Sequence, residues 1–314
     1  MRLSDRTKRR AILGSTAVLP HDLRVAARRR LLGDLELARA RAAALIIIGH
    51  PKSGNTWLRT MLSRLYQQRL GMPTDFTVKS DELALLHADA PRLLATNGYY
   101  SYEGVIGDAL AVGAPPNALK QKKIVLLARN PCDIAVSWFN QFTKRQSAGK
   151  RELINAFIDH PIDPETIGLW EFVRHSDIGL PCLIDFLNAW EERIAKLDHA
   201  ILVRYEDLRA DTPRTLRRIT DLLDDRFTDD ELAETIEWTS FENMQRLEAA
   251  GHFRRGGVQL IDARDESTRK VRRGKVGGYR ADFTAEQIAE LDKLMADGLS
   301  PRFGYSPEDE DETP

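Results

Sequence analysis

Two short runs of apolar residues, each followed by a helical pattern, dominate the first half of the chain. The first run, Leu45–Ile48, ends at Gly49. The second, Ile124–Ala128, ends at Arg129, and Pro131 opens the helix that follows it. Runs of this length that are apolar at every position are typical of strands buried on both faces of a parallel sheet.

The remaining pattern predicts one more strand, Ala200–Val203, and several helices. The helices are predicted at Lys79–Ala95, Pro181–Leu197, Pro213–Leu223, Asp229–Trp238, Phe241–Ala250 and Ala285–Met295. The segment Thr96–Pro116 is predicted to be an active-site loop rather than a packed element. The segment Gly149–Ile178 is predicted to be a further loop that shapes the site. Strands that alternate with helices predict a three-layer α/β fold, with a central parallel sheet of four or five strands flanked by helices.

The two ends of the chain differ in charge from its middle. Residues 1–43 are rich in arginine and carry helical spacing in their second half, so we expect a basic helical extension. We interpret it as a solvated helix, and the alternative is a peripheral membrane contact. Residues 44–305 are expected to form one domain, and residues 306–314 an acidic disordered tail.

Composition excludes several classes of protein. The 314 residues carry a formal net charge of -1, which gives no support for nucleic-acid binding. Only two cysteines are present, and no apolar run approaches the roughly 20 residues of a membrane span, so a cytoplasmic protein is expected. The seven histidines show no zinc-type spacing, and no metal is expected.

The loop between the first strand and its helix carries the candidate chemistry. Residues 49–56 read GHPKSGNT, close to the phosphate-binding pattern GxxxxGK[ST]. The lysine lies inside the loop at Lys52, and Asn55 occupies the position that a kinase fills with lysine. Backbone N–H groups at such a helix start favour phosphate, whereas the displaced lysine argues against the alternative of a P-loop kinase that uses ATP.

Residues 51–57, PKSGNTW, resemble the loop PKSGTTW of sulfotransferases that depend on 3′-phosphoadenosine 5′-phosphosulfate (PAPS). The resemblance implies that the loop binds the donor's 5′-phosphate and abuts its adenine, through Lys52, Ser53, Gly54, Asn55, Thr56 and Trp57. It also implies that Lys52 stabilises the charge that develops on the leaving oxygen.

Four later segments match the same family in the same order. Arg129 and Ser137 resemble RNPKDVAVS, which implies that they hold the 3′-phosphate. Tyr205, in YED, and Thr239 and Phe241, in TSFxxM, are implied to face the adenine. Residues 272–279 resemble RKGxxGDW, which adds Arg272, Arg273 and Gly274 to the 3′-phosphate site. Taken singly, these matches also fit a capping arrangement, a core pair or a surface loop.

The family implies in-line transfer of a sulfuryl group from PAPS, without a metal, to a hydroxyl or amine. The acceptor is a small molecule, a glycolipid or a lipid, and the protein a monomer or a homodimer. The Lys-Thr-His stretch that supplies the family's general base corresponds to residues 95–97, ATN, which lack the histidine. Glu103 is the first candidate for the base, followed by His87 and Asp108, while His50 is expected to face the wrong way. A non-catalytic nucleotide-binding relative stays open as a further alternative.

Overall fold

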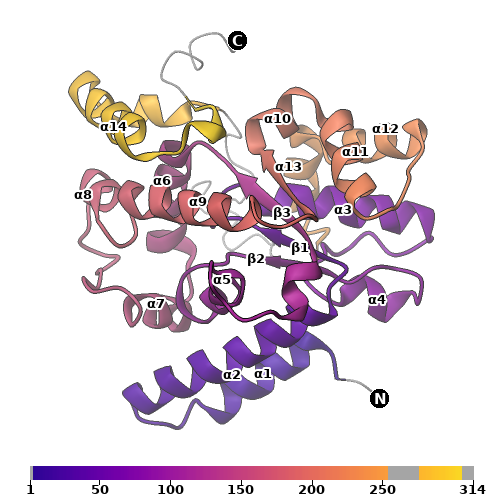
Figure 1. The fold of residues 1–314 in the computed structure, drawn as a ribbon, viewed down its shortest axis with the longest axis horizontal. Helices are drawn as coiled ribbons and strands as arrows, with labels where there is room; N and C mark the ends of the chain where they lie inside the picture. The colour runs from indigo at the N-terminus through magenta and orange to yellow at the C-terminus, as the bar shows by residue number, and fades with distance from the viewer. Residues whose placement is uncertain (1–2, 254–275, 306–314) are drawn as a thin grey trace.

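A computed structural model describes residues 3–253 and 276–305, which build a four-stranded parallel sheet with helices on both faces (Figure 1). The strand order is β2-β1-β3-β4. Ile48 of β1 pairs with Thr96 of β2 and with Leu126 of β3, while Ala128 of β3 pairs with Arg204 of β4. The predicted parallel α/β sheet of four or five strands is confirmed. The strands are β1 (Leu45–Ile48), β2 (Leu93–Thr96), β3 (Lys123–Ala128) and β4 (Ala200–Arg204).

The helices begin and end within a few residues of most sequence-based predictions. They are α1 (Asp5–Ser15), α2 (His21–Ala42), α3 (Asn55–Arg69), α4 (Glu82–Leu86), α5 (Val105–Leu110), α6 (Pro131–Asn140), α7 (Ala148–Asn155), α8 (Leu169–Arg174), α9 (Leu180–Ile194), α10 (Tyr205–Ala210), α11 (Thr212–Leu222), α12 (Asp229–Trp238), α13 (Phe241–Ala249) and α14 (Ala285–Gly298). Short 3-10 turns lie at η1 (Ser101–Gly104), η2 (Ala118–Gln121), η5 (Gly278–Asp282) and η6 (Pro301–Phe303), and a π-helical turn, η3 (Gln141–Arg145), extends α6.

Strand β1 is buried on both faces, which explains why every one of its residues is apolar. Leu45 and Ile47 pack toward α3 and the helices α10 to α12. Ile46 and Ile48 pack toward α2, α5 and α9 on the opposite face. All four side chains have no solvent exposure, and burying one such side chain is worth roughly 1.5–3 kcal/mol. The layers therefore hold the loop after β1 in a fixed position.

The N-terminal segment packs against the rest of the protein. Helices α1 and α2 form a hairpin whose Val25 and Leu32 are buried together with Tyr102 and Leu153. Arg28 adds an ion pair of 3.2 Å to a carboxylate on α7. In Figure 1 the two helices lie side by side beneath α5. The predicted helical segment therefore packs one face against the domain and leaves its other face exposed to solvent. The membrane contact stays a prediction.

Three further expectations are wrong. The segment 79–95 is not one helix, because α4 covers only Glu82–Leu86 and Leu93 begins β2. Pro91 cannot continue a helix, and the apolar residues after it pair with β1 instead. The segment 96–116 contains η1 and α5, with Tyr100 and Ile106 buried, so much of it is packed. The segment 149–178, also predicted to be a loop, contains most of α7 and all of α8, whose Phe172 is buried in the core.

Candidate active site

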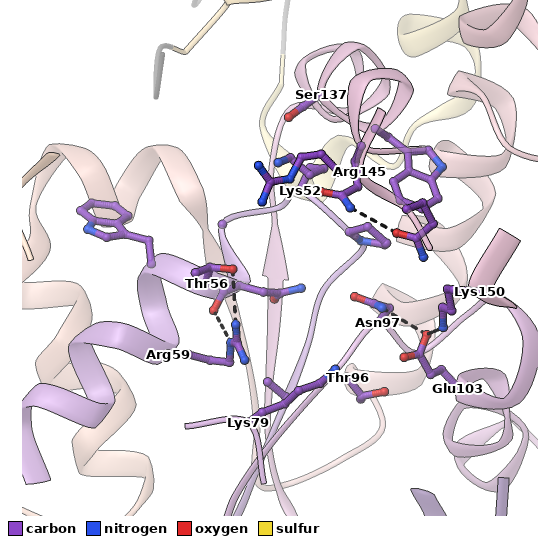
Figure 2. Close-up of a pocket in the computed structure, with 18 of the residues that line it drawn as sticks. Lys52, Thr56, Arg59, Lys79, Thr96, Asn97, Glu103, Ser137, Arg145 and Lys150 are labelled. Atoms are coloured by element: carbon purple, nitrogen blue, oxygen red, sulfur yellow. Dashed lines mark hydrogen bonds and ion pairs between the residues drawn. The ribbon is translucent and has the colours of Figure 1, made fainter. Parts of the chain in front are cut away.

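A cavity of about 1360 Å³ opens where the four strands end (Figure 2). Each strand contributes the residue at or just beyond its carboxyl end: the loop after β1, Asn97 after β2, Arg129 after β3 and Tyr205 after β4. Parallel sheets of this kind bind ligands at this edge, where the connections from the central strand leave in opposite directions. Here that point lies between β1 and β3, which the loop and Arg129 occupy.

The loop after β1 is shaped for an anion. Lys52 has a φ of +80° and Gly54 a φ of +100°, and α3 begins directly afterwards at Asn55. The first N–H groups of a helix lack partners within the helix and attract negative charge. Pro51, Lys52, Gly54, Asn55, Thr56 and Trp57 all line the cavity. The resemblance-based binding residues of this loop therefore lie together, with one exception, Ser53.

Ser53 is completely buried and is not part of the cavity lining. Its backbone N–H donates to the carbonyl oxygen of His50 over 3.1 Å. The His50 ring is also fully buried, at 5.5 Å from the Tyr100 ring and 5.7 Å from that of Trp138. Burial lowers the pKa of His50 to about 3, so the ring is neutral. His50 is placed outside the cavity lining, as expected.

Asn55 closes the loop on itself. Its Nδ2 donates to the carbonyl oxygens of Gly49 over 2.7 Å and His50 over 3.3 Å. A Cβ at Gly49 would lie 2.6 Å from Asn55 Oδ1 and 2.9 Å from the carbonyl oxygen of Leu127, so only glycine fits there. The Asn55 amide is therefore used inside the loop, which leaves its backbone N–H to face an anion.

Arg129 connects two parts of the site. Its Nη1 donates to the carbonyl oxygen of Lys52 and its Nη2 to Asp133, each over 3.2 Å. Asp133 also accepts hydrogen bonds of 3.1 Å from the backbone N–H groups of Gly277 and Tyr279. Asp133 thus connects Arg129 to residues that follow the arginine-glycine motif. Arg272, Arg273 and Gly274 themselves lie outside the described residues. Ser137, on α6, lines the cavity.

The predicted adenine-facing residues come together beside the loop. The Tyr205 ring lies so close to Gly54 that a Cβ there would be 2.6 Å from Cδ2 of Tyr205. Trp57 meets the Tyr205 ring edge-on at 5.8 Å and donates from Nε1 to the carbonyl oxygen of Thr239 over 2.9 Å. Thr239 is fully buried and its hydroxyl donates to a carbonyl of α12, while Phe241 lines the cavity.

Among the candidate bases, Glu103 alone lines the cavity. It is 4% exposed, and its Oε2 accepts from Lys150 Nζ over 2.8 Å and from Asn97 Nδ2 over 3.1 Å. Burial alone disfavours the carboxylate, but the ammonium groups of Lys150 and Lys79 together with both hydrogen bonds lower the pKa of Glu103. Figure 2 shows Asn97, Glu103 and Lys150 as one hydrogen-bonded group.

The other two candidates lie elsewhere. His87 is outside the cavity lining, and its Nδ1 lies 3.8 Å from the carboxylate of Asp89. Asp108 is exposed on α5, also outside the lining. His87 and Asp108 lie close to strand β2 in the sequence, but neither side chain reaches the cavity.

Several basic residues of the cavity were missed by sequence reasoning. Figure 2 shows Arg59 and Lys79 on one side of it, Arg145 near Lys52, and Lys150 beside Glu103. Arg59, on α3, is the next basic residue after Lys52 in the chain. It is buried, and its Nη2 donates to Thr56 Oγ1 over 3.3 Å. None of them stands in a motif, and only the fold brings them together.

Within residues 3–253 and 276–305, no group of three or more histidine, cysteine, aspartate or glutamate side chains is arranged to hold a metal. In the same part of the chain, no helix is both long and apolar enough to cross a bilayer.

Comparison with known families identifies the family to which the chain that forms this cavity belongs. Residues 43–302 match the model of the family described as "Sulfotransferase domain". The chain belongs to the sulfotransferase domain family. The matched range includes all four strands and the loop that carries Lys52, whereas the whole α1–α2 hairpin precedes it.

Curated relatives of this sulfotransferase-family chain are distant but similar over most of their length. Sulfotransferase 6B1 of Danio rerio is 23% identical, with 95% of this chain and 91% of the relative covered. The amine sulfotransferase of Oryctolagus cuniculus is 24% identical, with 86% and 85% covered.

Solved structures show the same fold. Mouse sulfotransferase SULT7A1, complexed with PAP, the donor's bisphosphate product, is 24% identical with a TM-score of 0.54, covering 85% of this chain and 87% of that one. Retinol dehydratase, in a complex with retinol and PAP, is 20% identical with a TM-score of 0.53, covering 84% and 86%.

Proposed function

We propose that this protein transfers a sulfuryl group from PAPS to a hydroxyl or amine of a small-molecule, glycolipid or lipid acceptor. The observation that carries the proposal is the bond between Arg129 and the Lys52 carbonyl. It brings the loop suited to a 5′-phosphate and the arginine suited to a 3′-phosphate to the same cavity. Membership of the family and the PAP complexes of its structural neighbours agree with this donor.

The described residues fit the donor chemically. The helix start at Asn55 and the guanidinium of Arg129 suit two phosphate groups, and Ser137 adds a hydroxyl on α6. Trp57, Tyr205 and Phe241 present aromatic surface beside the loop, which suits a purine. The motif of Arg272, Arg273 and Gly274, which lies outside the described residues, is proposed to complete the 3′-phosphate site.

PAPS supplies a sulfuryl group on a phosphate leaving group. In the proposed reaction the acceptor oxygen or nitrogen bonds to sulfur from the side opposite the leaving oxygen, whose bond to sulfur breaks. Lys52 donates to that oxygen as negative charge builds on it. Glu103 accepts the proton of the acceptor group, because its lowered pKa keeps it ionised at neutral pH. Lys150 and Asn97 hold the carboxylate in place.

Two alternatives predict different ligands. A P-loop kinase requires a lysine where this chain has Asn55, whose amide is bonded within the loop. A non-catalytic relative would bind the nucleotide and transfer no sulfuryl group, so it would need no base.

Ligand-induced stabilisation and transfer of labelled sulfate test the proposal. PAP should raise the melting temperature, by an amount equivalent to about 2.7 kcal/mol at a hundredfold excess over Kd, whereas ATP with magnesium should not. Incubation with sulfur-labelled PAPS and a library of phenols, amines, sugars and lipids should then give a labelled product. Stabilisation by ATP instead of PAP would favour the kinase, and PAP binding without any transfer would favour the non-catalytic relative.

The remaining expectations extend this proposal. We propose that residues 44–305 carry the transfer chemistry as one domain, that no metal takes part, and that the protein works in the cytoplasm as a monomer or homodimer. Residues 306–314, the expected acidic tail, lie outside the described residues. The basic segment 1–43, expected as an extension, takes part in the cavity and is considered next.

A further inference from the structure

The N-terminal hairpin forms one wall of the cavity. Arg6, Arg9 and Arg10 on α1 and Arg39 on α2 line it, together with Lys79 from the segment before α4. The arginines precede residue 43, where the match to the sulfotransferase domain begins. This wall is therefore contributed by a part of the chain that the family model does not include.

Lys79 makes no side-chain hydrogen bond or ion pair with any residue in the described part of the chain. Its side chain is partly exposed, and the loss of hydration on the wall of the cavity lowers its pKa to about 8. Glu103 opposes this shift, and the positive charges of Arg39, Arg59 and Arg9 add to it. Cationic groups from three segments of the chain thus surround an amine that has no bonded anion.

The acidic residues of this wall already have partners. Asp5 accepts from Ser80 Oγ over 2.5 Å and lies 3.5 Å from Arg39 Nε. Asp81 accepts the backbone N–H of Asp5 over 3.0 Å. Glu82 accepts the backbone N–H of Ser80 over 2.7 Å. The fourth carboxylate, Glu103, is bonded to Lys150 and Asn97 as described above. Asp5 and Glu103 are thus paired with Arg39 and Lys150, while Asp81 and Glu82 accept backbone N–H groups. In the described part of the chain, none of these carboxylates forms an ion pair with the Lys79 ammonium group.

The donor does not account for this charge. Lys52 and Arg129, which suit the donor phosphates, lie at the loop and the end of β3. Figure 2 shows Lys79 on the opposite side of the labelled group from Lys52 and Ser137, with Asn97 and Glu103 between the two sides. Arg9 and Lys79 both line the cavity and interact electrostatically with Glu103. They therefore lie near the space in front of Glu103, which the acceptor occupies in the proposed reaction.

We propose that the acceptor carries an anionic group, a phosphate, sulfate or carboxylate, which binds Lys79 and Arg9 beneath the α1–α2 hairpin. The assignment of this anion to the acceptor rests on the proposed function. The existence of an anion site at Lys79 and Arg9 does not depend on it. An oxyanion there gains charge-assisted hydrogen bonds and relieves the repulsion among neighbouring cations. The hairpin then selects the acceptor by its charge, while the family domain supplies the transfer chemistry.

Acylation of Lys79 tests the anion site without turnover. The protein is saturated with PAP to fill the donor phosphate sites and treated with acetic anhydride at pH 8, with and without inorganic phosphate at constant ionic strength. Mass spectrometry gives the acylation rate of Lys79 and of Lys144, an exposed lysine outside the cavity lining. Phosphate should slow acylation of Lys79 at least fivefold and leave that of Lys144 unchanged.

Matched variants connect this protection to the hairpin. Arg9→Gln should weaken protection by phosphate, whereas Arg30→Gln, the same charge change at an exposed site of α2 outside the cavity lining, should not. Equal protection of Lys79 and Lys144, or protection that does not depend on Arg9, would overturn the inference. Protection of Lys79 in a protein that fails to bind PAP would leave the anion site standing and remove the proposed function.

Transfer assays then identify the source of the anion. Glucose 6-phosphate is compared with glucose, and phosphatidylglycerol vesicles with phosphatidylcholine vesicles, in the presence of labelled PAPS. A rate at least tenfold higher for the anionic member of either pair, reduced by Lys79→Gln and not by Arg30→Gln, supports a soluble or a lipid anion respectively. If PAP binds and transfer shows no preference for either anionic member, the anion does not belong to the acceptor and the inference is wrong.

Discussion

Arg129 Nη1 donates a hydrogen bond to the carbonyl oxygen of Lys52 over 3.2 Å, which joins the end of β3 to the loop after β1. The two residues are 77 positions apart in the sequence. The same guanidinium lies over the Tyr205 ring, with 4.7 Å from its carbon to the ring centre. One side chain thus positions the loop and contacts the residue that follows β4, and its planar fork suits this task better than an ammonium group.

Replacing Arg129 should mainly weaken donor binding. Arg129→Ala removes a charge-assisted contact, worth about 1.5–3 kcal/mol, so the Kd for PAP should rise roughly tenfold or more. Arg129→Lys should recover only part of the loss, because one ammonium group cannot donate to the Lys52 carbonyl, to Asp133 and to a phosphate in the geometry of the guanidinium. Calorimetry with PAP measures both. Arg174→Ala, in an exposed ion pair outside the cavity lining, is the control and should bind normally.

Replacing Lys52 should lower the rate of transfer. Loss of one transition-state donor costs about 10²-fold in kcat, so Lys52→Ala and Lys52→Gly should both show it. The two variants separate the amine from the backbone, because the φ of +80° at this position suits glycine better than alanine. Lys52→Gly should be roughly 1 kcal/mol more stable than Lys52→Ala in urea unfolding. Full turnover in both variants would exclude the proposed role of Lys52.

Gly49→Ala should disturb the loop that Asn55 closes. The added Cβ falls 2.9 Å from the backbone carbonyl oxygen of Leu127, which cannot move away as a side chain can. We expect a loss of about 1–3 kcal/mol in the free energy of unfolding and a weaker affinity for PAP. Gly168→Ala adds the same methyl group in open space and should leave both unchanged. Identical unfolding of the two variants would contradict the tight packing of the loop.

Lys150 controls the pH dependence expected of Glu103. In the wild type the lowered pKa of Glu103 keeps the acid limb of kcat/KM below the ordinary glutamate value of about 4.3. Lys150→Met removes the nearby positive charge, and burial then raises the pKa of Glu103, so the limb should move to higher pH. Lys150→Arg keeps the charge and should keep the limb near its original position. An acid limb that is the same in all three proteins would exclude Glu103 as the base.

The buried His50 ring should make stability depend on pH. Its folded pKa of about 3 lies below the ordinary value of about 6.5, so between these values the unfolded chain binds a proton that the folded protein does not. The free energy of unfolding should therefore fall by a few kcal/mol as pH decreases from about 6.5 toward 3. His50→Phe keeps an aromatic ring and should show a smaller slope in urea unfolding measured across this window. A slope equal to that of the wild type would contradict a neutral, buried ring.

Elements with a strong local signal were predictable. Leu45–Ile48 is apolar throughout because both faces of β1 are covered, and Pro131 marks the start of α6 where its missing N–H is not needed. Strand β2 was missed because Leu93 and Leu94 also fit a helical spacing. Only their pairing with Leu45 and Ile46 of β1, 48 residues earlier in the chain, distinguishes the two structures.

The sequence by itself determined the family, the loop proposed to bind phosphate and the position of Arg129, because these depend on short stretches whose chemistry is local. Tertiary structure alone decided which side chains share the cavity. It buried Ser53 and His50, bonded Glu103 to Lys150, and placed the arginines of α1 beside Lys79. No spacing along the chain encodes such neighbours, since they result from how the hairpin and the helices pack around the sheet.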